Sequence, residues 1–193
     1  MKMLKYILSV FSIIISTQAF AEDIYRLDLN LSNVTFTTIK KQFVIEPAFI
    51  QPVSGKLTSK GKFSVLLNPN NIHTGIPLRD ARLKEIYFNV MKYPEIKVLG
   101  NFDTSLLSSN PQRHIISAKI TMFGITKTID LPIVIVPCGD KIMVNSSSPI
   151  IISGAEFGIP SENLINLAAK VGGIPISDKV PLNFNLLFAK EPL

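Results

Sequence analysis

The sequence predicts an all-β fold, either a sandwich or an antiparallel barrel, with one or two short helices. Beyond residue 22, apolar and polar residues alternate with a period of two along several segments, as expected for half-buried strands. Turn signals separate these segments about every eight to twelve residues. The chain has 193 residues, of which 47% are hydrophobic and 18% charged. This composition excludes a disordered chain, and the length favours a single domain.

Six segments carry the strand pattern. The clearest is the last, where the apolar residues at every second position from Val180 to Phe188 share one face. The segment 129–136 is apolar almost throughout, and Asp130 and Pro132 favour a sheet edge or a strand end there. The predicted strands cover residues 33–37, 62–67, 96–98, 116–122, 129–136 and 180–188. Turns are predicted between them at residues 68–71, 93–94, 108–111, 123–124 and 138–140.

Two segments are predicted to be helical, Leu78–Val90 and Pro160–Val171. The first places five charged residues beside Leu83 and Ile86. The second begins at a proline and is followed by Gly172, which is the usual asymmetry of helix ends. Because both are short in a strand-rich chain, we expect them to cap or cross the sheet and not to form the core.

Residues 1–21 match a secretory signal peptide. Two lysines lie in the first five residues, Tyr6–Ile15 carries no charge, and Ala19–Ala21 fits the small–any–small cleavage pattern. The apolar run is short for a permanent membrane helix, and an uncleaved anchor is the alternative. We therefore expect an exported protein with one mature domain, residues 22–193.

Composition excludes several classes of site. Two histidines and one cysteine are too few for a protein-only zinc site, and a single cysteine cannot form an internal disulfide. The chain has no nucleophile-elbow or phosphate-loop motif, and Glu156 has no evident second carboxylate for acid–base chemistry. We expect no enzyme activity, no metal and no cofactor. His73 and His114 are expected at the surface, and Cys138 as a free, unreactive thiol.

The charge of the chain does not indicate a nucleic-acid partner. The net formal charge is +6, from 20 basic and 14 acidic residues. The local basic excess is limited to Lys40, Lys41, Lys56, Lys60 and Lys62, with no interleaved aromatic residues for base stacking. We expect these lysines on solvated strand edges.

The inward-facing residues predict an apolar interior. An eight-stranded barrel is just wide enough either for packed side chains or for one small ligand. An interior of Phe, Val, Ile, Leu and Met leaves the polar groups of a sugar or nucleotide unpaired, but it suits a hydrocarbon chain. The alternative for each candidate is ordinary core packing. The candidate lining residues are Phe36, Phe63, Val65, Val98, Phe102, Ile120, Met122, Leu131, Phe184 and Phe188.

Several sequence blocks, in order and at sensible spacing, resemble the YceI-like family of lipid- or polyisoprenoid-binding periplasmic proteins. The resemblance runs from about Tyr25 to Phe188. Its most specific part is Thr74–Leu83, continuing through Tyr87–Val90 to Lys92–Ile96. The other blocks are Tyr25–Asp28, Ser32–Phe36, Val53–Leu57, Ala118–Lys127, Ala155–Ile159 and Ser177–Leu182.

The resemblance implies a lipocalin-like antiparallel barrel of about eight strands with a helix packed on it. It also implies a periplasmic binding or carrier protein, not an enzyme, for a polyisoprenoid, an isoprenoid quinone or a fatty amide. Transient contact with a membrane, and a monomeric or homodimeric state, are further expectations. The alternative is a filled barrel that docks a cell-envelope partner. Two parts depart from the family: Arg82 stands where many relatives have histidine, and Phe43–Phe49 matches only loosely.

Arg79 is the one polar candidate for ligand contact. It precedes Asp80 on the first predicted helix, and adjacent helical residues point in different directions, so the two need not pair. Its guanidinium fork suits a carboxylate, a quinone oxygen or a phosphate at the barrel mouth. The alternative, which we favour, is that Arg79 anchors the helix to the barrel rim.

Overall fold

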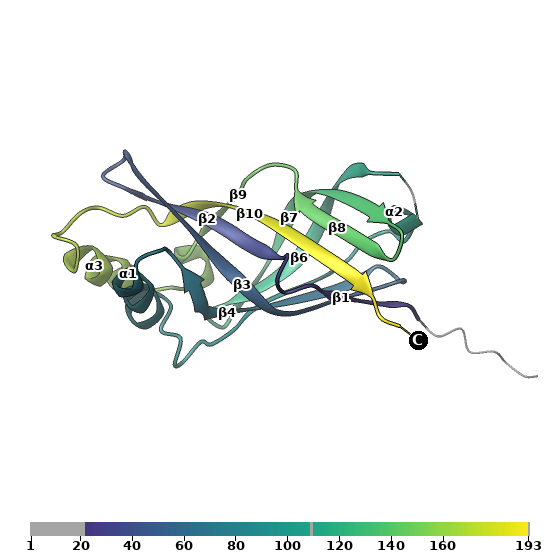
Figure 1. Cartoon of the computed structure of the whole chain (residues 1–193). Helices are drawn as coiled ribbons and strands as arrows, with labels where there is room; N and C mark the ends of the chain where they lie inside the picture. Colours follow the sequence, from purple (N-terminus) through teal and green to yellow (C-terminus); the bar gives the residue numbers. More distant parts are fainter. Residues whose placement is uncertain (1–21, 109, 193) are drawn as a thin grey trace, which may run out of the picture.

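The computed structural model describes residues 22–108 and 110–192. The predicted signal peptide, residues 1–21, lies outside the described residues. The longer strands alternate in direction along most of the chain, and the helices are short (Figure 1). The strands are β1 (Ile24–Leu27), β2 (Asn33–Lys40), β3 (Val44–Thr58), β4 (Lys62–His73), β5 (Ile96–Asn101), β6 (Gln112–Met122), β7 (Ile125–Cys138), β8 (Lys141–Ser146), β9 (Ile150–Ser153) and β10 (Lys179–Lys190).

Eight strands form a closed antiparallel barrel. From β2 to β8 each strand pairs with the next along the chain, and β10 pairs with both β8 and β2. Figure 1 shows β10, in yellow, passing between β2 and β8. The short strands β1 and β9 also pair with β10. The structure therefore confirms the predicted antiparallel barrel of about eight strands and rules out the sandwich.

The period-two pattern places one face of each predicted strand inside the barrel. In β10 the five alternating residues from Val180 to Phe188 all face the interior. In β4, Val65 and Leu67 are buried, and in β6 Ile116, Ala118 and Met122 are buried. Tight hairpins join β6 to β7 at Phe123-Gly124 and β7 to β8 at Gly139-Asp140, as predicted.

The predicted turn at residues 68–71 is wrong. These residues lie inside β4, opposite a place where the β3 register shifts between Ile50, Pro52 and Ser54. An irregularity of this kind accommodates extra residues and a proline inside a strand, so it shares the Asn and Pro signals of a turn. Pro69 is fully buried there. The alternation did not predict β3, which contains Pro47 and Pro52.

The predicted strand end at 129–136 is wrong, because β7 continues from Ile125 to Cys138, but the predicted edge holds for part of this segment. Residues 129–132 pair with β6 alone, and β8 pairs only with residues 133–138. Pro132 lies one residue beyond the last β8 pair, Ile133–Ser146, and its carbonyl accepts a hydrogen bond from the Ser147 amide at 2.9 Å. Within a strand, the nitrogen and the carbonyl of one residue point to the same side, so the Pro132 nitrogen also faces away from β6. The missing N–H of the proline therefore costs no hydrogen bond between β7 and β6.

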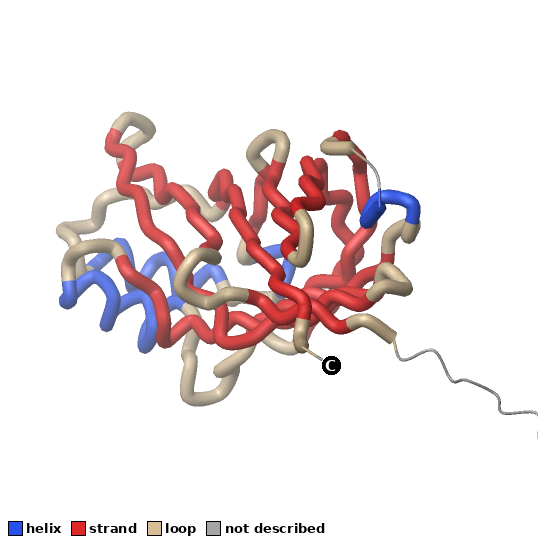
Figure 2. Tube along the Cα trace, turned by 45° about the vertical axis from the view of Figure 1, so that its right-hand side comes forward, coloured by secondary structure: helices blue, strands red, loops and turns tan. Residues whose placement is uncertain are grey.

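The helices gather mainly at one end of the barrel, where α1 and α3 lie together (Figure 2). The first predicted helix is α1 (Pro77–Arg82) followed by a π-helical turn, η1 (Leu83–Tyr87). The second is α3 (Ser161–Ala169). Leu83 and Leu167 are buried, which shows that η1 and α3 pack against the barrel interior. Two further short helices, α2 (Ser105–Ser108) and η2 (Ala155–Phe157), were not predicted.

Asp178 ties this helical cap to the barrel. Its carboxylate accepts hydrogen bonds from the Ser153 hydroxyl, from the Ala155 amide at 3.2 Å, and from the Tyr87 hydroxyl at 3.5 Å. The side-chain amide of Asn163 in α3 donates to the Tyr87 carbonyl at 2.9 Å. Burial, together with the adjacent Asp178 charge, raises the pKa of Tyr87 well above its usual value.

We expect Gly61→Ala to lower the free energy of unfolding by about 2 kcal/mol or more. Gly61 has a φ of 77°, and a Cβ there would overlap the Phe102 carbonyl oxygen. Gly139→Ala is the matched control, because Gly139 also has a positive φ, 60°, but nothing lies within 4 Å of its Cβ position. The control is expected to cost only about 1 kcal/mol in urea unfolding. Equal costs at the two sites would contradict the steric argument.

Tyr87→Phe is expected to make stability less sensitive to alkaline pH. The raised pKa keeps folded Tyr87 neutral while the unfolded phenol ionises near pH 10. Its contribution to stability is therefore complete below about pH 10 and is lost above it, at about 1.4 kcal/mol per pH unit. The measurement is urea unfolding at pH 8 and pH 11 for both proteins. Parallel losses of stability in the two would show that Tyr87 ionises as easily in the folded chain.

Candidate functional site

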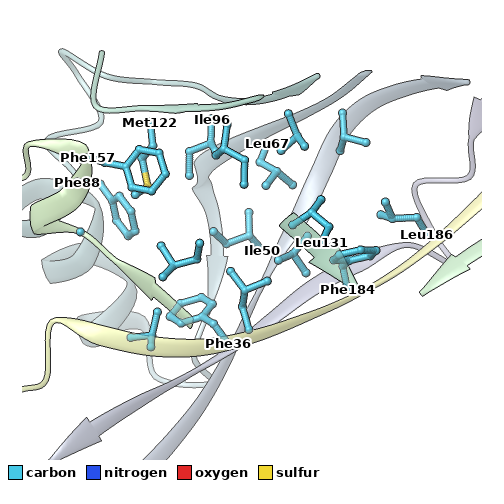
Figure 3. Close-up of a pocket in the computed structure, with 18 of the residues that line it drawn as sticks. Phe36, Ile50, Leu67, Phe88, Ile96, Met122, Leu131, Phe157, Phe184 and Leu186 are labelled. Atoms are coloured by element: carbon cyan, nitrogen blue, oxygen red, sulfur yellow. The ribbon is translucent and has the colours of Figure 1, made fainter. Parts of the chain in front are cut away.

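An apolar cavity of about 190 Å³ lies inside the barrel. All eight barrel strands contribute side chains to its wall, together with η1, η2 and α3 at the capped end. Figure 3 shows side chains from distant parts of the sequence, among them Phe36, Ile50, Met122 and Phe184, pointing into the same space. The side chains of the interior therefore do not meet across the middle, and the barrel is hollow.

The size of the cavity suits a hydrocarbon segment. At about 10–15 Å³ of such space per water molecule, the cavity has room for on the order of a dozen waters. A methylene group is of similar size, so the same space holds an alkyl segment of on the order of a dozen carbons. An apolar cavity of this kind offers water too few hydrogen-bond partners to be filled favourably. A longer chain requires the lining side chains to move outward or the chain to leave through an opening.

The wall of this cavity carries almost no polar chemistry. Asp178 is the one charged residue among those that line it, and its oxygens are engaged by Ser153, Ala155 and Tyr87. The Thr38 hydroxyl is also used, because it donates to the Glu46 carbonyl at 3.3 Å. Among residues 22–108 and 110–192, no Lys, Arg or His lines the cavity. A polar ligand group buried here gains little, and an unpaired one costs about 2 kcal/mol or more.

The structure brings together ten of the eleven residues predicted as candidates for ligand contact. They come from six strands, with Phe102 directly after the end of β5, and share the cavity wall: Phe36, Phe63, Val65, Val98, Phe102, Ile120, Met122, Leu131, Phe184 and Phe188. Their contact with a ligand stays a prediction. Arg79 is the exception, because it does not line this cavity.

Sequence reasoning missed lining residues of two kinds. Leu67, Ile96 and Leu186 lie on faces that the alternation had already turned inward, so the same pattern was sufficient to nominate them. Ile50 and Phe157 had no such signal, because Ile50 lies in the proline-interrupted β3 and Phe157 in the short helix η2. Their inward direction depends on the packing of the whole barrel.

A second cavity, of about 260 Å³, adjoins the first and is charged. Lys40, Glu46, Arg79 and Arg82 line it, and Glu46 bridges two of the cations. The Glu46 Oε1 atom lies 2.8 Å from Arg79 Nη2, and Oε2 lies 2.5 Å from Lys40 Nζ. The two cavities share Thr38, Leu83, Leu167 and Ile176 in their walls. They are therefore adjacent compartments at the capped end of the barrel.

The Arg79–Glu46 ion pair joins α1 to β3, which is the geometry expected of an anchor for the helix. Asp80 has other partners: it accepts hydrogen bonds from the Thr74 amide at 2.8 Å and from the Thr74 hydroxyl at 2.5 Å. Arg79 and Asp80 thus act separately, as their adjacency on a helix predicted. Lys40 departs from the prediction of a solvated edge, because its side chain is only 14% exposed and is held by Glu46.

Other candidate groups are dispersed over the surface. Cys138 is exposed with a free thiol, and His73 is exposed and stacks on Phe49 with 4.9 Å between ring centroids. His114 is also exposed. Within residues 22–108 and 110–192, no three His, Cys, Asp or Glu residues are grouped closely enough to hold a metal ion. In the same part of the chain, every helix is too short or too polar to cross a membrane.

Comparison with solved structures shows the same fold in three bacterial proteins. A polyisoprenoid binding domain from Saccharophagus degradans, implicated in plant cell wall breakdown, has a TM-score of 0.81 at 24% identity, covering 86% of this chain and 98% of that one. Burkholderia cenocepacia BcnA has a TM-score of 0.57 at 15% identity, covering 83% and 98%. A Campylobacter jejuni YceI protein has a TM-score of 0.52 at 15% identity, covering 99% and 100%.

Comparison with curated protein sequences gave no significant match. The model of one protein family, however, matches this chain over residues 25–188, which is most of its length. That match spans every strand of the closed barrel, and it agrees with the eight-stranded ring and the helical cap. The chain belongs to the YceI-like domain family.

Proposed function

We propose that this protein binds a long-chain, lipid-like molecule by enclosing its hydrocarbon chain in the barrel. The observation that carries the proposal is the open apolar cavity of about 190 Å³, walled by all eight strands. Family membership and the likeness to a polyisoprenoid binding domain support the same class of ligand. A polyisoprenoid, an isoprenoid quinone or a fatty amide each offers such a chain.

Burial of the chain supplies enough free energy for this function. Each methylene group removed from water contributes about 0.8 kcal/mol, so a dozen carbons contribute roughly 10 kcal/mol. Association and the ordering of a flexible chain oppose this by several kcal/mol. The difference corresponds to roughly millimolar to sub-millimolar binding, and micromolar affinity, at about −8 kcal/mol, is reached when about fifteen carbons or more are buried. The alternative of a filled barrel requires side chains that meet in the interior, and the cavity counts against it.

The chemistry of the wall supports binding without reaction. Tyr87 and Asp178 are the ionisable residues that line the apolar cavity. Asp178 is held by Ser153 and Ala155, and the raised pKa of Tyr87 keeps its phenol neutral at ordinary pH. Neither is placed as an activated nucleophile or as a free base. We therefore propose a carrier or reservoir and not an enzyme.

We further propose that the protein works in the periplasm and meets a membrane transiently, as a monomer or a homodimer. The signal-peptide pattern of residues 1–21 supports export. Exposed apolar residues at the capped end support contact with a membrane: Phe43 and Ile45, at the tip of the β2–β3 hairpin, are 83% and 67% exposed. Ile76 and Leu78, beside the charged cavity, are exposed as well. Such residues can enter the interfacial layer of a bilayer while a lipid is exchanged.

The mature protein, purified from cells that export it, is expected to carry a long-chain lipid in stoichiometric amount. Organic extraction followed by mass spectrometry identifies the lipid and its ratio to protein. Delipidated protein is then expected to take up a fluorescent hydrophobic probe. An empty extract combined with no uptake of the probe would contradict the carrier proposal. The remaining alternative would be a filled barrel that docks a cell-envelope partner.

Val98→Trp is expected to abolish uptake of the probe with only a small loss of stability. Val98 lines the cavity from β5, and an indole there fills much of the space that a ligand needs. Leu99→Trp is the matched control, because Leu99 is the next residue of the same strand and is exposed on the outer face. Thermal unfolding checks that both variants fold. Uptake by folded Val98→Trp equal to that of the control would mean that ligand binds elsewhere.

A further inference from the structure

We propose that the charged cavity holds the anionic end, a phosphate or a carboxylate, of the lipid whose chain lies in the apolar cavity, and that Arg82 determines this preference. The inference rests on the proposed function and narrows its ligand to lipids with a negatively charged end. It gives a role to Arg82, which lines the charged cavity.

The two cavities adjoin each other and share part of their walls. Thr38, Leu83, Leu167 and Ile176 contribute to both walls, so these four residues mark the junction. On one side of the junction the wall is apolar except for Asp178 and a few neutral polar groups. On the other side lie Lys40, Arg79 and Arg82, together with Glu46. This arrangement matches a ligand with a long apolar chain and one charged end.

The charge of the second cavity favours an anion. Three cationic side chains and one carboxylate line it, which is a net formal charge of +2. Glu46 is shared between Lys40 and Arg79. Within residues 22–108 and 110–192, no ion pair or side-chain hydrogen bond involves Arg82, although its residue is half-buried. A half-buried cation without a partner favours the binding of an anion beside it.

The position of Arg82 allows it to act together with Arg79. The two lie three residues apart on the helical stretch that begins at Pro77, and residues at this spacing share a helix face. Two guanidinium groups on one face can each present a fork of N–H donors, which matches the oxygens of a phosphate or carboxylate. A neutral quinone or amide end leaves the excess charge uncompensated.

The apolar cavity cannot take the anionic end itself. Asp178 is its one charged lining residue and is itself a carboxylate, so it repels an anion placed there. In the described part of the chain, no lysine, arginine or histidine lines that cavity to offset the repulsion. The ligand is therefore oriented, with its chain in the barrel and its charged end beside Arg82.

The test is competition for a fluorescent hydrophobic probe by three ligands with one chain length: dodecyl phosphate, dodecanoate and dodecanol. Wild-type protein, delipidated, is expected to bind the two anions roughly tenfold to a hundredfold more tightly than the alcohol. Arg82→Gln is expected to remove most of this preference while leaving the affinity for dodecanol unchanged. Arg82→Lys keeps the positive charge and is expected to retain part of the preference.

Arg113→Gln is the matched control, because Arg113 is an exposed arginine on β6 that lines neither cavity. It is expected to behave as wild type, and thermal unfolding confirms that each variant is folded. Inorganic phosphate is expected to compete far more weakly than dodecyl phosphate. If phosphate alone binds as tightly, the anion site is independent of the lipid chain and the inference fails.

The remaining outcomes separate this inference from the function on which it rests. Equal affinity of wild type for all three dodecyl ligands overturns the anionic preference but leaves lipid binding intact. An unchanged preference in folded Arg82→Gln removes the role of Arg82. If the probe binds and none of the dodecyl ligands displaces it, or if the probe does not bind at all, the proposed function and the inference both fail.

Discussion

The pairing of β10 with β8 on one side and β2 on the other is the constraint on which the rest of the structure depends. It turns a meander of strands into a ring and leaves the sheet without a free edge at the join. Once the ring is closed, one face of every strand must point inward. The alternation in the sequence then becomes an apolar wall, and the diameter of an eight-stranded ring determines whether a space remains inside it.

The two cavities give the molecule two chemical environments in series. The barrel supplies an apolar interior. At its capped end, charged side chains from β2, β3 and α1 line the adjoining cavity. The ion pairs of Glu46 with Lys40 and Arg79 belong to this adjoining cavity. The Arg79–Glu46 pair ties α1 to the barrel wall, whereas the Lys40–Glu46 pair joins the neighbouring strands β2 and β3.

Sequence reasoning reached the barrel and most of its wall, because strand periodicity is local. Phe184 and Phe188 could be assigned to the inside from β10 alone. It failed where a residue has two structural uses: Asn68 and Pro69 indicated a turn, but they lie within β4 opposite a register shift of β3. At Pro132 the predicted edge is present only on the side where the pairing with β8 ends. Strand periodicity alone could not predict the hollow interior or the charged cavity. The first depends on how side chains from all eight strands meet, and the second brings Glu46 beside Arg79 across 33 residues of sequence.

The Tyr87–Asp178 contact bears on how the proposed ligand would enter and leave the barrel. Ladder hydrogen bonds hold the ring around its whole circumference, so widening it means breaking many of them together. The cap is held by apolar packing and by few polar bonds, of which the 3.5 Å contact from Tyr87 is a long one. The least costly motion is a local one, in which η1 and α3 swing away while the ring stays intact. For the ligand proposed above, entry and exit would then require displacement of the helical cap and not of the barrel strands.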